Sequence, residues 1–91
     1  KRYFTKEDAK KIGDALGIDW NVYDLDQFRY GMDVELEHGT ADPETNVTND
    51  DPLTTGKIAY AHMKEFLDYY ERLEEMEEEA EEEWDRKKAG K

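Results

Sequence analysis

The sequence contains no cysteine and no serine, and it has only two prolines. Without cysteine, neither a disulfide nor a thiolate metal site can stabilise the chain, and without serine a serine-based catalytic triad is excluded. There is also no phosphate-cradling glycine loop and no HExxH motif. No apolar run approaches the roughly 20 residues that a membrane-spanning helix needs, and no signal-peptide segment is recognisable. We therefore expect a soluble, cytoplasmic protein.

Charge of one sign dominates the chain, because 25 acidic residues against 13 basic ones give a net charge of −12. Direct binding to nucleic acid is not expected, since contacts to phosphate need lysine and arginine. An acidic surface does suit a basic protein partner, and it could imitate a nucleic acid. The same charge is also explained by solubility alone.

With 91 residues, the chain is one domain near the lower size limit for a single core. We divide it into a helical domain over 1–78 and a Glu-rich helical extension with a basic end over 79–91. A core this small could be enlarged by homodimerisation through the apolar stripe of the C-terminal helix.

Helix caps mark the expected elements. Thr5 precedes an apolar repeat that ends at Gly17, which predicts a helix over about 6–16. Asp24 opens a second helix over about 24–38.

Residues 40–51 form a long loop rich in turn formers. Asp51 and Pro52 then open a third helix of about 30 residues. The expected fold is therefore all-α: a small three-helix domain, with helices two and three antiparallel and a long projecting C-terminal helix.

Polar side chains interrupt both long apolar stripes. Glu35 and His38 share one face of the second helix, and His62 and Glu65 share one face of the third. The only two histidines of the chain are in these pairs. Two facing helices that each offer a glutamate and a histidine resemble helical carboxylate metal sites, for which zinc, manganese or iron would be suitable. A buried polar cluster without metal explains the same residues and is the interpretation that ranks first; the metal site ranks second and unrelated surface positions third.

Other candidate sites are weaker. The loop that starts at Asp42 has oxygen-bearing side chains at alternate positions, but it lacks the glycine and the final glutamate of a calcium loop. Aromatic residues near Tyr69 and Tyr70 are typical of a core whose hydroxyls reach polar partners. Catalysis would need a metal-bound water at Glu35, His38 and His62, which leaves a minimal metal-dependent hydrolase as a further hypothesis. Residues of the acidic helix that could contact a basic partner are Glu74, Glu78, Glu81 and Trp84.

Four stretches, FTKEDAKKIGDALGIDW, QFRYGMDVELEHG, TNVTNDDP and TGKIAYAHMKEFLDYYERLEEME, resemble a family of small acidic prokaryotic and phage proteins that is classed as a domain of unknown function. The resemblance covers about residues 3–78 and implies no activity or cofactor. Family members tend to have proline before the Asp-Tyr-Tyr element, whereas this chain has Leu67, so the third helix is expected to stay unbroken. The signature that the resemblance implies consists of Glu35, Glu37, His38, His62, Glu65, Asp68, Tyr69 and Tyr70.

Overall fold

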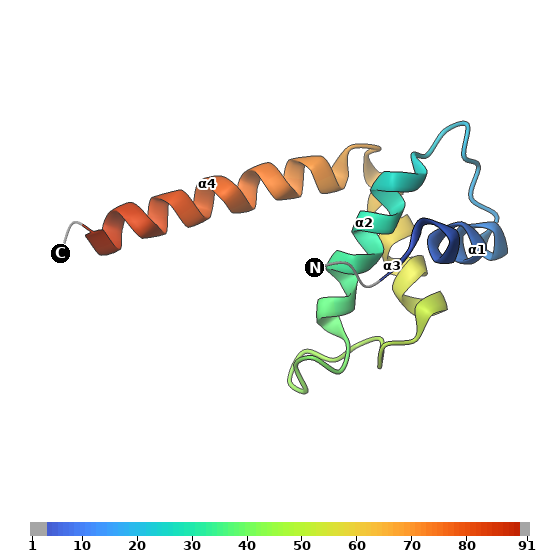
Figure 1. The fold of residues 1–91 in the computed structure, drawn as a ribbon, viewed down its shortest axis with the longest axis horizontal. Coiled ribbons are helices and arrows are strands. Elements are labelled where there is room, and N and C mark those ends of the chain that lie inside the picture. The colour runs from blue at the N-terminus through green and yellow to red at the C-terminus, as the bar shows by residue number, and fades with distance from the viewer. Residues whose placement is uncertain (1–3, 90–91) are drawn as a thin grey trace.

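The computed structural model describes residues 4–89, which form four α-helices and one short 3-10 helix (Figure 1). In chain order these are α1 (Lys6–Leu16), α2 (Leu25–Glu35), η1 (Leu36–His38), α3 (Pro52–Glu65) and α4 (Tyr69–Ala89). There is no strand in the described part of the chain, so the all-α fold class is confirmed. None of the described helices combines the length and the apolar character that crossing a membrane requires.

The N-terminal caps lie where the sequence predicts them. Thr5 and Asp8 form a reciprocal capping box at the start of α1, with each backbone N–H donating to the other side chain at 3.0–3.2 Å. Gly17 ends α1 in the left-handed conformation, with φ at 77°. Asp24 caps α2 and Asp51 caps α3, each by accepting from a backbone N–H three residues later. The first helix and the start of the next two are therefore confirmed.

The core lies between α1, α2 and α3, and α2 and α3 run in roughly opposite directions (Figure 1). Close approach of α3 to α1 depends on Gly56, because a Cβ there would lie 2.5 Å from a methyl carbon of Ile12. Every α-helix contributes to the core, and Ile18 contributes from the connection between α1 and α2. The buried apolar residues are Ala9, Ile18, Phe28, Met32, Ala59, Met63 and Tyr70.

The connection from η1 to α3 is held by hydrogen bonds rather than by apolar packing. The backbone N–H groups of Val47 and Thr48 both donate to the carbonyl oxygen of His38, at 2.6 and 3.3 Å. Asn49 and Asp50 then adopt left-handed conformations, with φ at 52° and 62°, which asparagine and aspartate tolerate better than most residues. The loop therefore returns to the end of η1 before α3 begins.

The prediction of a single long third helix is wrong, because the helix breaks between α3 and α4. Phe66 is extended, with φ at −157° and ψ at 144°, and it is 46% exposed instead of facing the core. The turn directs Tyr70 into the core, where it is fully buried. Burying one tyrosine removes about 150–250 Å² from water, whereas backbone groups at an exposed turn can bond to water. Tertiary burial therefore overrides the local preference for a continuous helix.

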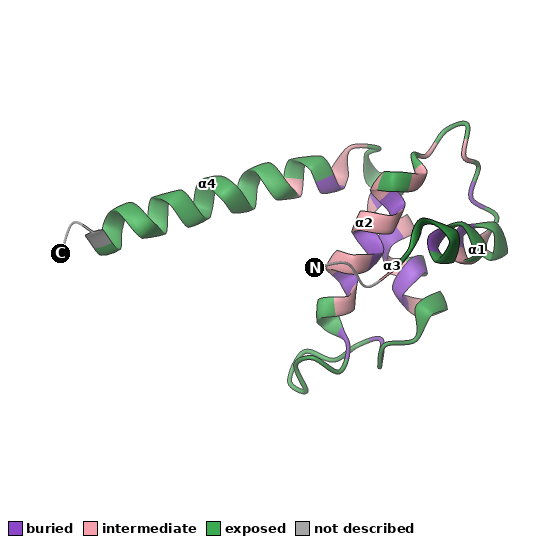
Figure 2. Ribbon diagram, viewed as in Figure 1, coloured by how far each residue is buried: buried purple, intermediate pink, exposed green. Residues whose placement is uncertain are grey.

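Beyond its first turns, α4 projects away from the other helices (Figure 1). With this helix included, the longest dimension of the molecule is 51 Å. Every residue from Glu74 to Lys88 is exposed, whereas the buried residues lie in α1, α2 and α3, in the connections between them and at Tyr70 (Figure 2). The projecting C-terminal helix is thus present, and the domain boundary proposed at residue 78 falls inside it. Residues 90–91 of the proposed extension lie outside the described residues.

Candidate functional site

A buried carboxylate lies at the end of α2. Glu35 is the last residue of this helix and only 5% exposed. It follows Phe28 and Met32 at helical spacing, so the same face that supplies the core also carries the carboxylate inward. A buried carboxylate is costly unless it is hydrogen-bonded or paired with a cation, so its surroundings define the candidate site.

Tyr70 supplies the one side-chain hydrogen bond to this carboxylate among the described residues. Its hydroxyl donates to Glu35 Oε2 at 2.8 Å across 35 positions of sequence. The ring packs on Gly31 so closely that a Cβ there would lie 2.4 Å from a ring carbon. Burial first, and the Glu35 carboxylate second, raise the pKa of Tyr70 above its ordinary value. The phenol therefore stays protonated and remains a donor at any physiological pH.

Two imidazoles face the two oxygens of Glu35. His62 Nε2 lies 3.8 Å from Oε2, and His38 Nε2 lies 4.0 Å from Oε1. Both gaps are longer than a hydrogen bond, which spans about 2.7–3.2 Å for nitrogen and oxygen. The His38 side chain is 53% exposed and that of His62 31%. We call Glu35, His38, His62 and Tyr70 the Glu35 centre.

The other nitrogen of His62 faces a second carboxylate. His62 Nδ1 is buried and has no hydrogen-bond partner among residues 4–89, and it lies 3.8 Å from Glu65 Oε1. The imidazole plane is fixed by Tyr69, which stacks on it with a centroid distance of 4.4 Å and an interplanar angle of 12°. His62 is therefore held between Glu35 on one side and Glu65 on the other.

Two of the residues predicted as metal ligands, His38 and His62, each lie near Glu35, but near different oxygens of its carboxylate. Glu65 lies near only the far nitrogen of His62. As they stand, no three or more histidine, cysteine, aspartate or glutamate side chains in residues 4–89 are close enough to hold a metal ion. The hydrogen bond from Tyr70 to Glu35 was not predicted from the sequence. The available signal was a glutamate on a buried stripe, which needs a donor from another helix.

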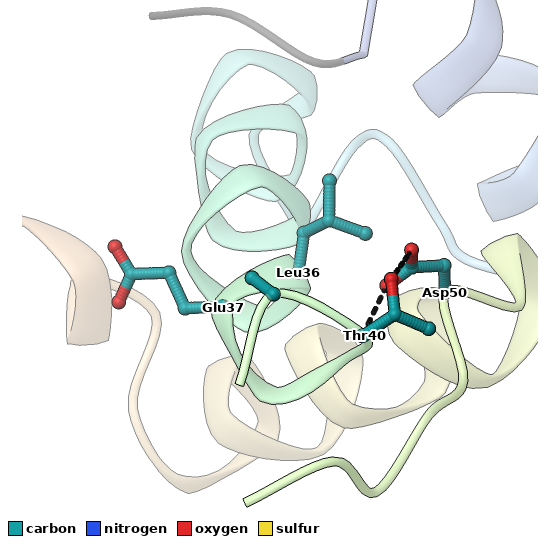
Figure 3. Close-up of a pocket in the computed structure, with 5 residues that line it drawn as sticks. Leu36, Glu37, Thr40 and Asp50 are labelled. Carbon is teal, nitrogen blue, oxygen red and sulfur yellow. Dashed lines mark hydrogen bonds between the residues drawn. The ribbon is translucent and has the colours of Figure 1, made fainter. Parts of the chain in front are cut away.

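A shallow hollow of about 250 Å³ lies beside η1, lined by Leu36, Glu37, Thr40, Ala41 and Asp50 (Figure 3). The Asp50 carboxylate accepts from both the backbone N–H and the hydroxyl of Thr40. These bonds hold the pKa of Asp50 below its ordinary value. Glu37 points away from this pair (Figure 3). Thr40 and Asp50 are therefore paired with each other, and their hydrogen bonds fasten the loop that follows His38.

The residues predicted to contact a partner lie elsewhere. Glu74, Glu78, Glu81 and Trp84 are all exposed on α4. Of the remaining signature residues, Asp68 accepts from Arg72 Nε at 2.9 Å at the start of α4. This side-chain bond is the main cause of a lowered pKa at Asp68.

Comparison with known proteins gives no match among curated proteins and none among solved structures. A family model does match residues 9–79, which is most of the chain, and its description is protein of unknown function (DUF5661). The matched region contains α2, η1, α3 and the first half of α4, and so the whole Glu35 centre. The chain therefore belongs to the DUF5661 family of proteins of unknown function.

Proposed function

We propose that this chain is a small helical binding module whose site is the Glu35 centre, and that the centre takes a divalent cation of the zinc, manganese or iron(II) class. The observation that carries the proposal is the pair of imidazole nitrogens that face a buried carboxylate across gaps of 3.8 and 4.0 Å. Imidazole nitrogen and carboxylate oxygen together suit these cations.

A shared cation would need the ligand atoms to lie closer together than they do in this structure. Zinc lies about 2.0–2.2 Å from nitrogen and oxygen ligands, so two ligand atoms around a tetrahedral ion are about 3.4 Å apart. Both imidazole–carboxylate distances would therefore have to shorten, and both imidazoles would have to turn toward the same point. His38 is half exposed and ends the short helix η1, so its side chain has room for this movement.

The surrounding residues resemble the outer partners of metal ligands. A metal-bound histidine usually turns its second nitrogen toward a carboxylate or carbonyl, which fixes the ring. Glu65 lies on that side of His62, whose Nδ1 has no other partner among the described residues. Tyr70 orients the Glu35 carboxylate in the same way. We therefore assign Glu35, His38 and His62 as ligands and Glu65 as a positioning residue, which revises the four-ligand prediction.

A bound cation would also offset an electrostatic cost. Glu35 is buried within a chain of net charge −12, and a divalent ion would neutralise that carboxylate where water does not reach it. Without a cation, the same residues form a polar cluster that fastens α4 to α2 through Tyr70. The two alternatives predict different metal contents and different responses to chelator.

The test is elemental analysis of the tag-free protein, together with titration calorimetry of Zn²⁺, Mn²⁺ and Fe²⁺ into chelator-treated protein. We expect about one ion per chain to survive dialysis. Ligand at 100 times its Kd stabilises a fold by about 2.7 kcal/mol, which raises the melting temperature of a domain of this size by about 10 °C or more.

Variants separate the roles of the side chains. Glu35→Gln and His62→Ala should abolish stoichiometric binding, whereas Glu65→Gln should weaken it by about 10- to 100-fold. Glu78→Gln, on the exposed face of α4, is the matched control and should bind like the wild type. No retained metal, together with an unchanged melting temperature in chelator, would make the centre a purely structural cluster. If metal is retained, turnover on phosphoester and peptide panels by the loaded protein would decide whether the centre also performs hydrolysis.

A further inference from the structure

An apolar stripe on α4 is exposed along its length. Met76 is 53% exposed and Trp84 is 63% exposed, and exposed Ala80 lies between them at a spacing of four residues from each. This spacing places all three on one helix face. The stripe continues from Leu73, which packs against the core. We call Leu73, Met76, Ala80 and Trp84 the α4 stripe; it is about 17 Å long at 1.5 Å per residue.

Carboxylates border the stripe on both sides. Because successive residues are about 100° apart around a helix, Glu77 and Glu81 lie along one edge and Glu79 and Glu83 along the other. Glu78 and Glu82 lie on the opposite face of the helix. In total, α4 has ten acidic and four basic residues, a net charge of −6. The stripe is thus an apolar seam between two rows of negative charge.

The exposed end of the stripe already binds a cation within the chain. Lys87 Nζ lies over the Trp84 ring, 5.5 Å from its centroid, and also 3.4 Å from Glu83. Shallow hollows on two sides of the indole are lined mainly by charged side chains: Glu81, Asp85 and Lys88 on one, and Glu83 and Lys87 with Ala80 on the other. An arginine or lysine from another molecule would find the same two attractions, an aromatic face and a carboxylate.

We infer that the α4 stripe docks an amphipathic helix of another protein, with apolar residues on one face and lysine or arginine along both edges. Such a helix pairs its apolar face with the stripe and its cations with the glutamate rows, as flanking charges select partners in coiled coils. A second copy of this chain is a poor occupant, because two α4 helices would bring their glutamate rows together.

This surface is distinct from the Glu35 centre. The family match ends at residue 79, so Ala80, Glu81, Glu83 and Trp84 lie beyond it. The outer part of the docking surface therefore lies outside the matched region, and the inference rests on α4 alone, so its test is separate from the test of the proposed cation site.

The test uses a fluorescein-labelled synthetic helix of leucine and lysine, with leucine at i, i+3, i+4 and i+7. Its control is a peptide of the same composition with the leucines scattered around the helix. Fluorescence anisotropy at physiological salt measures both affinities for the full chain. We expect binding of the patterned peptide at least about tenfold tighter than that of the scattered one, because only the patterned one presents an apolar face to the stripe.

Two double variants locate the binding face, because they remove equal charge at the same spacing. Glu77→Gln with Glu81→Gln changes one edge of the stripe, whereas Glu78→Gln with Glu82→Gln changes the far face. The edge pair should weaken binding by about fivefold and the far pair by less than about twofold. Trp84→Ala should weaken it by about tenfold or more, with helix content checked by circular dichroism.

Three outcomes would overturn the inference. Equal affinity for the patterned and scattered peptides would show that only charge is recognised. Equal losses in the two double variants would show that no face of α4 is preferred. A dimer by light scattering that dissociates in the Trp84→Ala variant would show that a second copy occupies the stripe.

Discussion

Replacing Tyr70 with phenylalanine tests whether the hydroxyl of this residue stabilises the fold by satisfying Glu35. The substitution removes one oxygen and leaves the ring on Gly31 and in the core, so apolar burial is conserved. The buried Glu35 carboxylate then loses its 2.8 Å hydrogen bond, and the nearest imidazole nitrogens remain at 3.8 and 4.0 Å.

The expected cost is set by what remains unpaired. A hydrogen bond to a charged group contributes about 1.5–3 kcal/mol, and a buried acceptor left without a donor carries its full desolvation penalty. We therefore expect Tyr70→Phe to lower the free energy of unfolding by about 2–3 kcal/mol. Urea unfolding followed by circular dichroism measures this change in a domain of this size. Chelator in every sample keeps any bound metal out of the comparison.

A double-mutant cycle with Glu35→Gln isolates the interaction. The glutamine amide still accepts from the Tyr70 hydroxyl but carries no charge, so Tyr70→Phe should cost only about 1 kcal/mol in that background. The coupling energy should then be about 1–2 kcal/mol. A change within about 0.5 kcal/mol for Tyr70→Phe, or no coupling with Glu35, would refute the argument that this bond anchors α4.

Three further predictions concern single positions. Gly31→Ala should lower the free energy of unfolding by about 1–3 kcal/mol despite its better helix propensity, because the new Cβ would lie 2.4 Å from the Tyr70 ring; an increase in urea midpoint would contradict this. Hydrogen bonds from Thr54, chiefly from its side chain and secondly from its backbone N–H, hold the pKa of Asp51 below its ordinary value. The stability that the Asp51 carboxylate contributes is therefore present above about pH 4 and is lost as the pH falls through the lowered pKa. The stability gap between wild type and Asp51→Asn should therefore shrink below about pH 4, and thermal melts across that range that show a constant gap would be inconsistent with this assignment. Trp84→Ala should leave the free energy of unfolding within about 0.5 kcal/mol, since that side chain is 63% exposed, and a larger loss would mean that the indole packs against the body of the molecule.

Local signals account for the parts of the fold that the sequence predicts well. Thr5, Asp24 and Asp51 each cap a helix by accepting from a backbone N–H three residues later, so their effect is contained in a few neighbouring positions. The same is true of Gly17, whose positive φ ends α1. Helix starts of this kind can be located without knowing what packs against them.

The break before α4 depends on contacts that sequence spacing does not show. Residues 66–68 contain neither proline nor glycine, and a continuous helix there is locally reasonable. The turn is favoured because it delivers Tyr70 to Glu35, which lies 35 positions earlier. Helical spacing did predict that Glu35 and His62 would approach each other. Helical spacing could not predict that Glu65 would lie near His62 Nδ1, the nitrogen that faces away from Glu35. That position depends on the path of the chain after α3.

The attachment of α4 has a thermodynamic consequence. Tyr70 belongs both to the first turn of α4 and to the Glu35 centre, so one side chain is shared by the exposed helix and the buried carboxylate. Any occupant of the centre that favours one position of Tyr70 thereby favours one orientation of the helix that carries it. Linkage is reciprocal, so a molecule that holds α4 in that orientation must strengthen binding at the centre by the same factor. The two surfaces of this chain, although separate in space, would then behave as coupled sites.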